Sequence, residues 1–114
     1  MNLLLVALGG ALGAVLRFLV GEQALRLGIA APISTLAINV AGSFLLGWLA
    51  AGGRVSLLLG VGVLGGFTTF SAFSVQTLGL LERAPLWALA YVAGSVLMSL
   101  LAAWCGLMLG RAGA

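Results

Sequence analysis

The run Gly65-Gly66-Phe67-Thr68-Thr69 lies in the middle of the third of four long apolar stretches and decides how that stretch folds. Two adjacent glycines lower helix propensity, and two β-branched threonines follow closely. This order predicts a break in a membrane-spanning helix; an unbroken glycine-rich helix packed against its neighbours is the alternative. A break at membrane depth is tolerated only where protein or a water-filled cavity satisfies the freed backbone groups. We therefore expect an ion site near residues 65–69, where freed carbonyls favour a cation and the new helix N-terminus favours an anion.

Composition indicates a membrane protein. Hydrophobic residues make up 63% and charged residues 6% of the 114 residues. A helix needs about 20 apolar residues to cross the hydrocarbon core, so the chain has room for four crossings and little else. The apolar stretches cover about residues 2–20, 33–51, 55–80 and 86–110. We predict an all-α integral membrane protein of the plasma or inner membrane, with one four-helix domain over residues 1–114.

Most of the charges lie between or beyond the apolar stretches. These intervening segments are marked by Glu22, Arg26 and Pro32, by residues 52–54 and by residues 82–85. With four crossings, Arg54 and Arg111 lie on one side of the membrane, and Arg26 and Arg83 lie on the other. Excess Lys and Arg on one side normally fixes the orientation, and here neither side has an excess. We take dual topology, with copies inserted both ways and paired head to tail, as a hypothesis.

Several classes of chemistry are excluded by what the chain lacks. It has no His and one cysteine, Cys105, so a conventional zinc site and an intrachain disulfide are ruled out. Apart from Arg17, the apolar stretches hold no side chain charged at neutral pH, so a proton-carrying exporter is disfavoured. We predict a passive path rather than an enzyme. Arg17 is interpreted either as an interfacial anchor or as a positive charge that draws anions into a vestibule.

Polar side chains recur at helical spacing in the second and fourth stretches. Thr35, Asn39 and Ser43 recur every four residues on one face of the second helix, and Tyr91, Ser95 and Ser99 form a similar stripe on the fourth. An amide in hydrocarbon requires a partner, so Asn39 either joins two helices or donates to a passing ion. The hydroxyls either bond back to their own helix or line a path.

Two phenylalanines follow the predicted break. Phe70 and Phe73 stand three residues apart and share a helix face. Core packing is one interpretation. The other is that their weakly positive ring edges line the path of a small anion without holding it tightly.

Small residues at four-residue spacing predict close helix packing in lipid. Three such glycine pairs are Gly9 and Gly13, Gly62 and Gly66, and Gly106 and Gly110.

Three runs together resemble the motifs of the Fluc (CrcB) fluoride channels, and with Tyr91, Ser95 and Ser99 the likeness covers the whole chain. The runs are residues 9–18, residues 35–47 and residues 65–74, the last containing Gly-Gly-Phe-Thr-Thr-Phe-Ser. The resemblance implies an antiparallel, dual-topology homodimer with two anion pores and a central structural Na⁺. It also implies export of cytoplasmic fluoride down its electrochemical gradient, which lowers fluoride toxicity.

The resemblance also implies roles for individual residues. Gly65 and Thr68 would hold Na⁺ through main-chain carbonyls, and Arg17 would lie in the vestibule. The residues implied to line the pore and bind fluoride are Asn39, Phe70, Phe73, Ser71, Ser74, Tyr91, Ser95, Ser99 and Thr35.

The chain departs from the family pattern at several positions. Gln76 stands where a Glu is common, Ala72 where Thr is common, Ser34 where Gly is frequent, and Phe18 where an aromatic hydroxyl is frequent. Gln76 keeps hydrogen-bonding capacity but carries no charge. Two rival functions remain at the level of the sequence: a small multidrug-type exporter, and a non-transporting assembly or holin-like protein in which the polar stripes only join helices.

Overall fold

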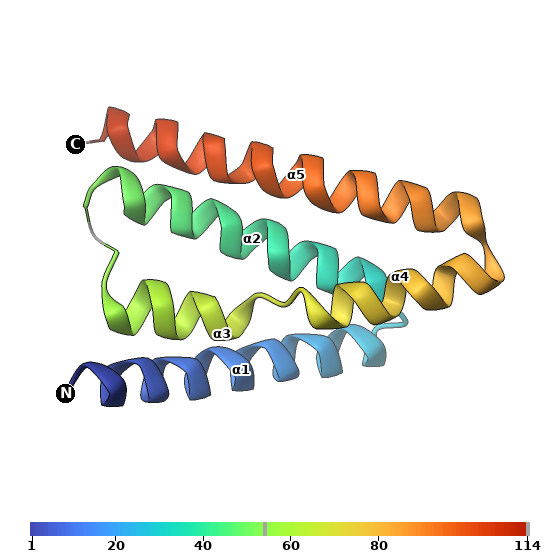
Figure 1. The fold of residues 1–114 in the computed structure, drawn as a ribbon, viewed down its shortest axis with the longest axis horizontal. Helices are drawn as coiled ribbons and strands as arrows, with labels where there is room; N and C mark the ends of the chain where they lie inside the picture. Colours follow the sequence, from blue (N-terminus) through green and yellow to red (C-terminus); the bar gives the residue numbers. More distant parts are fainter. Residues whose placement is uncertain (54, 114) are drawn as a thin grey trace.

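A computed structural model describes residues 1–53 and 55–113, and all regular secondary structure in these two segments is helical. The elements are α1 (Asn2–Arg26), α2 (Ala31–Ala51), the π-helix η1 (Leu57–Leu64), α3 (Gly65–Phe67), α4 (Ser71–Arg83) and α5 (Pro85–Ala112). They form an elongated bundle of 44 × 30 × 23 Å, with both termini at the same end (Figure 1). Within the described residues, four spans are long and apolar enough to cross a membrane: α1, α2, the segment Leu57–Arg83, and α5.

The predicted four-span membrane fold is therefore confirmed, with adjusted boundaries. The first span extends beyond residue 20 to Arg26, so Glu22 lies inside α1 rather than in a turn. The turn that follows it is short because Gly28, at φ 78°, allows a Schellman ending, in which Ile29 N–H donates to Ala24 O at 2.8 Å. Arg26 and Arg83 end α1 and α4 at one end of the bundle, and Arg111 lies near the other; Arg54 lies outside the described residues.

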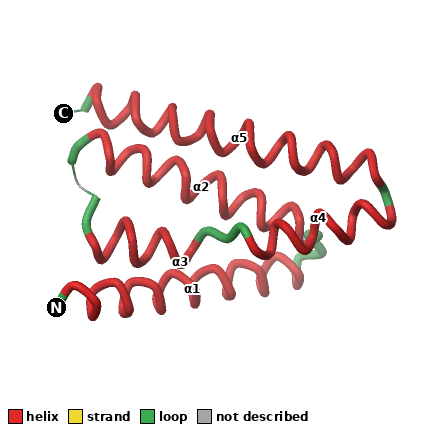
Figure 2. Tube along the Cα trace, viewed as in Figure 1, coloured by secondary structure: helices red, strands yellow, loops and turns green. Residues whose placement is uncertain are grey.

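The third span is broken, as predicted, but the break lies after the glycines rather than at them. Gly65 and Gly66 remain helical in α3, and the backbone leaves the helix at Thr68, with φ −81° and ψ 158°. Figure 2 shows this interruption as a short loop between α3 and α4, halfway along the span. Thr68 N–H and Thr68 Oγ1 both donate to Leu64 O, at 3.1 and 3.0 Å, which keeps the turn before the break helical.

The first part of the broken span is wider than an α-helix. In η1, Val61 N–H reaches back five residues to Ser56 O at 3.3 Å, and Ser56 Oγ caps the start by accepting from Leu59 N–H at 3.0 Å. A π-helix is rare and is often found at functional sites. Nothing in the sequence pattern predicts this π-helical geometry.

Glycines let the helices approach closely, as the four-residue spacing predicts. A Cβ on Gly62 would lie 2.8 Å from the Cα of Gly9, which brings α1 against η1. A Cβ on Gly106 would lie 2.9 Å from Trp48 N, which brings α5 against α2. The bundle thus consists of two closely packed pairs, α1 with η1–α3 and α2 with α5 (Figure 1).

Candidate functional site

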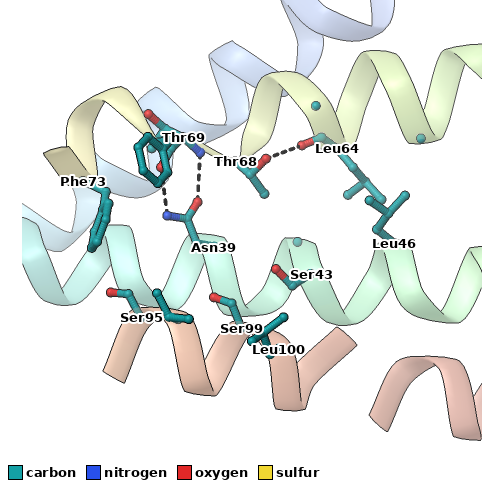
Figure 3. Close-up of a pocket in the computed structure, with 15 residues that line it drawn as sticks. Asn39, Ser43, Leu46, Leu64, Thr68, Thr69, Phe73, Ser95, Ser99 and Leu100 are labelled. Atoms are coloured by element: carbon teal, nitrogen blue, oxygen red, sulfur yellow. Dashed lines mark hydrogen bonds between the residues drawn. The ribbon is translucent and has the colours of Figure 1, made fainter. Parts of the chain in front are cut away.

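Asn39 holds the backbone at the break. Its Oδ1 accepts from Thr69 N–H at 2.8 Å, and its Nδ2 donates to Thr69 O at 2.9 Å (Figure 3). One side chain on α2 therefore satisfies both polar groups of a residue that has left the helix. Of the two roles that the sequence allows for Asn39, the joining of helices is seen directly. Nδ2 carries a second N–H, and Asn39 lines the larger pocket described below, so the donor role is compatible with the first.

This arrangement removes the helical partners of two other carbonyls. In a continuous helix Thr69 N–H would donate to Gly65 O, but here it donates to Asn39. Ala72 N–H would donate to Thr68 O, but here it donates to Thr69 Oγ1 at 3.2 Å. Gly65 and Thr68 therefore keep carbonyl oxygens without their regular donors, and both residues line the larger pocket.

Arg17 caps the end of α3 from the neighbouring helix. Its Nε donates to Gly66 O at 3.2 Å, and the residue is half-buried. Gly66 O has lost its helical donor because Phe70 lies in the break. A cation at a helix C-terminus also interacts favourably with the helix dipole. Neither interfacial anchoring nor a free vestibule charge describes Arg17 completely, because part of its guanidinium is committed to this carbonyl.

Three aromatic rings form a row in space beside the break. The centroids of Phe70 and Phe73 are 5.4 Å apart, and those of Phe73 and Tyr91 are 5.1 Å apart, with interplanar angles of 55° and 51°. Tilted pairs of this kind place the edge of one ring towards the face of the next. Phe73 is buried, whereas Phe70 is 77% exposed in the isolated chain.

The larger pocket, of about 580 Å³, lies where α2, the broken span and α5 face one another (Figure 3). Its polar side chains are those of Asn39, Ser43, Thr68, Thr69, Ser95 and Ser99. Ser95 is buried, and its Oγ has no hydrogen-bond partner within the described residues. Buried hydroxyls in proteins are usually hydrogen-bonded, so Ser95 Oγ is a candidate contact for a polar ligand in this pocket.

A smaller pocket, of about 230 Å³, is lined by α1, the first part of α2, Thr69 and α4. Arg17, Thr35 and Gln76 line it, together with the exposed Glu22. Gln76 Oε1 accepts a hydrogen bond from the Tyr91 hydroxyl at 2.8 Å. Thr69 lines both pockets, so the break separates them.

The pockets bring together many of the residues selected from the sequence. The larger contains Asn39, Phe70, Phe73, Ser95, Ser99, Gly65 and Thr68, and the smaller contains Arg17 and Thr35. Ser71, Ser74 and Tyr91 line neither pocket; Ser74 Oγ donates to Phe70 O at 2.9 Å in its own helix. Thr69 was not predicted as a site residue, although its backbone N–H and C=O both bond Asn39 at the break. Hydrogen bonds to the backbone leave no pattern in a sequence. Ser43 belongs to the predicted stripe on α2, although no role in the pore was predicted for it.

Together, the fold and the site define a multi-pass membrane protein with a polar break in one span, an arrangement typical of channels and transporters. The model of the family described as "CrcB-like protein, Camphor Resistance (CrcB)" matches residues 4–107, and the chain belongs to this family.

Relatives of nearly the same length carry the name "Fluoride-specific ion channel FluC". The chain is 50% identical to the one from Caulobacter sp. (strain K31), over 96% of this chain and 94% of the relative. It is 50% identical to the one from Rhizobium meliloti (strain 1021), over 97% of both. It is 51% identical to the one from Chelativorans sp. (strain BNC1), over 96% of both.

Proposed function

We propose that the protein is a fluoride-specific passive channel through which cytoplasmic fluoride leaves the cell. The observation that carries the proposal is the broken span, where Asn39 and Arg17 hold a non-helical backbone between two polar pockets. The names of the relatives support fluoride as the ion. Family membership favours a channel over a multidrug exporter, an assembly protein or an enzyme, and Glu22 and Glu82 lie near the ends of α1 and α4 rather than in the middle of a span.

Such a channel needs no energy source of its own. Fluoride enters cells as neutral HF and is trapped as the anion in a more alkaline cytoplasm. With the inside negative, the membrane potential favours exit of one unit charge by about 2.3 kcal/mol per 100 mV. Selectivity over chloride comes from a narrow path whose donors replace the hydration of a small anion.

The working unit of the proposal is an antiparallel homodimer. Gly65 is exposed, its carbonyl lacks its helical donor, and the ring of Phe70 beside it is 77% exposed. A backbone carbonyl without a partner is costly in lipid, so the face that exposes Gly65 and Phe70 requires a protein partner that shields it from lipid. A second copy in the opposite orientation supplies a cover of the same chemistry, and the balanced arginines permit that orientation.

A Na⁺ ion fits the carbonyls at the break. Gly65 O and Thr68 O are hard oxygen donors without their regular partners, and they stand at the C-terminal end of α3, where the helix dipole favours a cation. Two carbonyls are too few for a full shell, so the paired copy supplies the same two. Exchange of Na⁺ for N-methylglucamine is expected to lower the assembled fraction in gel filtration and the fluoride efflux, and Na⁺ is expected to restore both. Unchanged assembly and efflux after complete exchange would contradict the site.

The exposed ring of Phe70 lines the proposed anion path. Phe70→Ile replaces a ring edge by aliphatic carbon, and an aromatic contact is worth about 0.5–1.5 kcal/mol, so we expect fluoride efflux from liposomes to fall roughly tenfold. Phe44→Ile is the matched control, because Phe44 lines neither pocket. Undiminished efflux from the Phe70 variant would remove this ring from the path.

Arg17 combines a cap with a positive charge in the smaller pocket. Arg17→Met removes both, and we expect about a tenfold loss of efflux, since hydrogen bonds from charged groups contribute roughly 1.5–3 kcal/mol and this one is partly exposed. Arg17→Lys keeps the charge without the planar donor group, so its fluoride efflux should lie between those of the wild type and Arg17→Met. Arg26→Met, at the exposed end of α1, is the control. Equal efflux from all four proteins would show that neither role matters.

The proposed function is tested by loading liposomes with equal fluoride and chloride and following both ions with selective electrodes. Purified protein is expected to release fluoride quickly and to retain chloride. Release of both ions at similar rates would indicate an unselective pore. Release of neither would support a purely structural protein.

A further inference from the structure

The side chain of Gln76 is held by one end only. Its Oε1 accepts the hydroxyl proton of Tyr91 at 2.8 Å, and within residues 1–53 and 55–113 no hydrogen bond uses its Nε2. Tyrosine has a single O–H, and here it is directed at Gln76. Tyr91 therefore offers no donor to an anion in this arrangement, whereas Gln76 retains two N–H groups.

Those two N–H groups belong to a residue that lines the smaller pocket. Gln76 shares this pocket with Arg17, whose Nε is committed to Gly66 O, and with Ala31, the first residue of α2. The N-terminus of a helix carries a partial positive charge, so α2 adds to a field that favours an anion. The exposed Glu22 is the one carboxylate among the residues that line the pocket.

We propose that Gln76 Nε2 donates directly to the anion in the smaller pocket, and that Tyr91 is a positioning residue that orients the amide. The hydrogen bond from Tyr91 fixes Oε1 away from the anion and so presents the N–H groups to it. The inference rests on the proposed fluoride channel and assigns this donor to a side chain that carries no charge.

Fluoride efflux from liposomes distinguishes a donor from a mere support for Tyr91. Gln76→Met matches the length of glutamine and removes both polar ends, and we expect efflux to fall roughly tenfold, the usual scale for loss of a hydrogen bond to a charged group. Tyr91→Phe removes only the orienting bond, and we expect a loss of no more than about threefold. If Gln76 served only to hold Tyr91, the two variants would lose efflux equally.

A control variant keeps the test decisive. Gln23→Met, on the exposed surface of α1, should behave as wild type. Wild-type efflux from Gln76→Met would overturn the inference and leave the proposed channel function intact. Absence of fluoride efflux from the wild-type protein would overturn the proposed function and the inference with it.

Discussion

Asn39→Asp is expected to reduce fluoride efflux by about a hundredfold or more while the protein still assembles. Asp has nearly the same shape, and one carboxylate oxygen still accepts from Thr69 N–H. The other oxygen then faces Thr69 O, where Nδ2 donates at 2.9 Å in the wild type. Loss of a partner for a buried carbonyl costs about 1–3 kcal/mol; Thr69 O is partly buried, and repulsion between the two oxygens adds to the cost. A negative charge beside an anion path opposes fluoride further.

The matched control for this variant is Asn2→Asp, at the exposed start of α1. Gel filtration of both variants checks assembly, and the fluoride electrode measures efflux. Wild-type efflux from Asn39→Asp would mean that the hydrogen bonds between α2 and the break do not shape the path.

Gly13→Ala is expected to destabilise the fold itself. A Cβ at this position would lie 2.8 Å from Phe67 N and closer still to the carbonyl oxygen of Val63, so α1 must move away from η1 and α3. Overpacking of this kind costs roughly 1–3 kcal/mol, and here the obstacle is backbone that cannot rotate aside. The displacement would also carry Arg17 away from Gly66 O. We expect a lower midpoint of thermal unfolding and a smaller monodisperse fraction.

Gly10→Ala provides the comparison on the same helix, because a Cβ there meets no atom within 4 Å. The two variants make the same chemical change three residues apart, so helix propensity affects them alike. Equal stability of the Gly13 and Gly10 variants would contradict the close packing of α1 against the broken span.

Hydropathy and residue spacing predicted the parts of the structure that depend on local physics. Four spans, the small-residue contacts at Gly9, Gly62 and Gly106, and the existence of a break near Gly65 all follow from the sequence pattern. Asn39 was recognised because an amide in an apolar helix requires a partner.

The details of the break depended on partners that are distant in the chain. Thr68 keeps the glycines helical by bonding Leu64, and Asn39, 30 residues before Thr69, takes the next backbone groups out of the helix. Arg17 and Gly66 lie 49 residues apart. Contacts of this separation have no periodic signature, so neither the position of the break nor the cap was predictable.

The account is tested most directly by the zero-current potential of the protein in a planar bilayer with a tenfold fluoride gradient and equal chloride on both sides. A passive fluoride-selective channel should give about 59 mV, with the sign set by fluoride, because one charge crosses per ion and no other ion contributes. A zero-current potential near zero, in a bilayer that conducts measurable current, would show that chloride or another ion carries the current. That result would contradict the account.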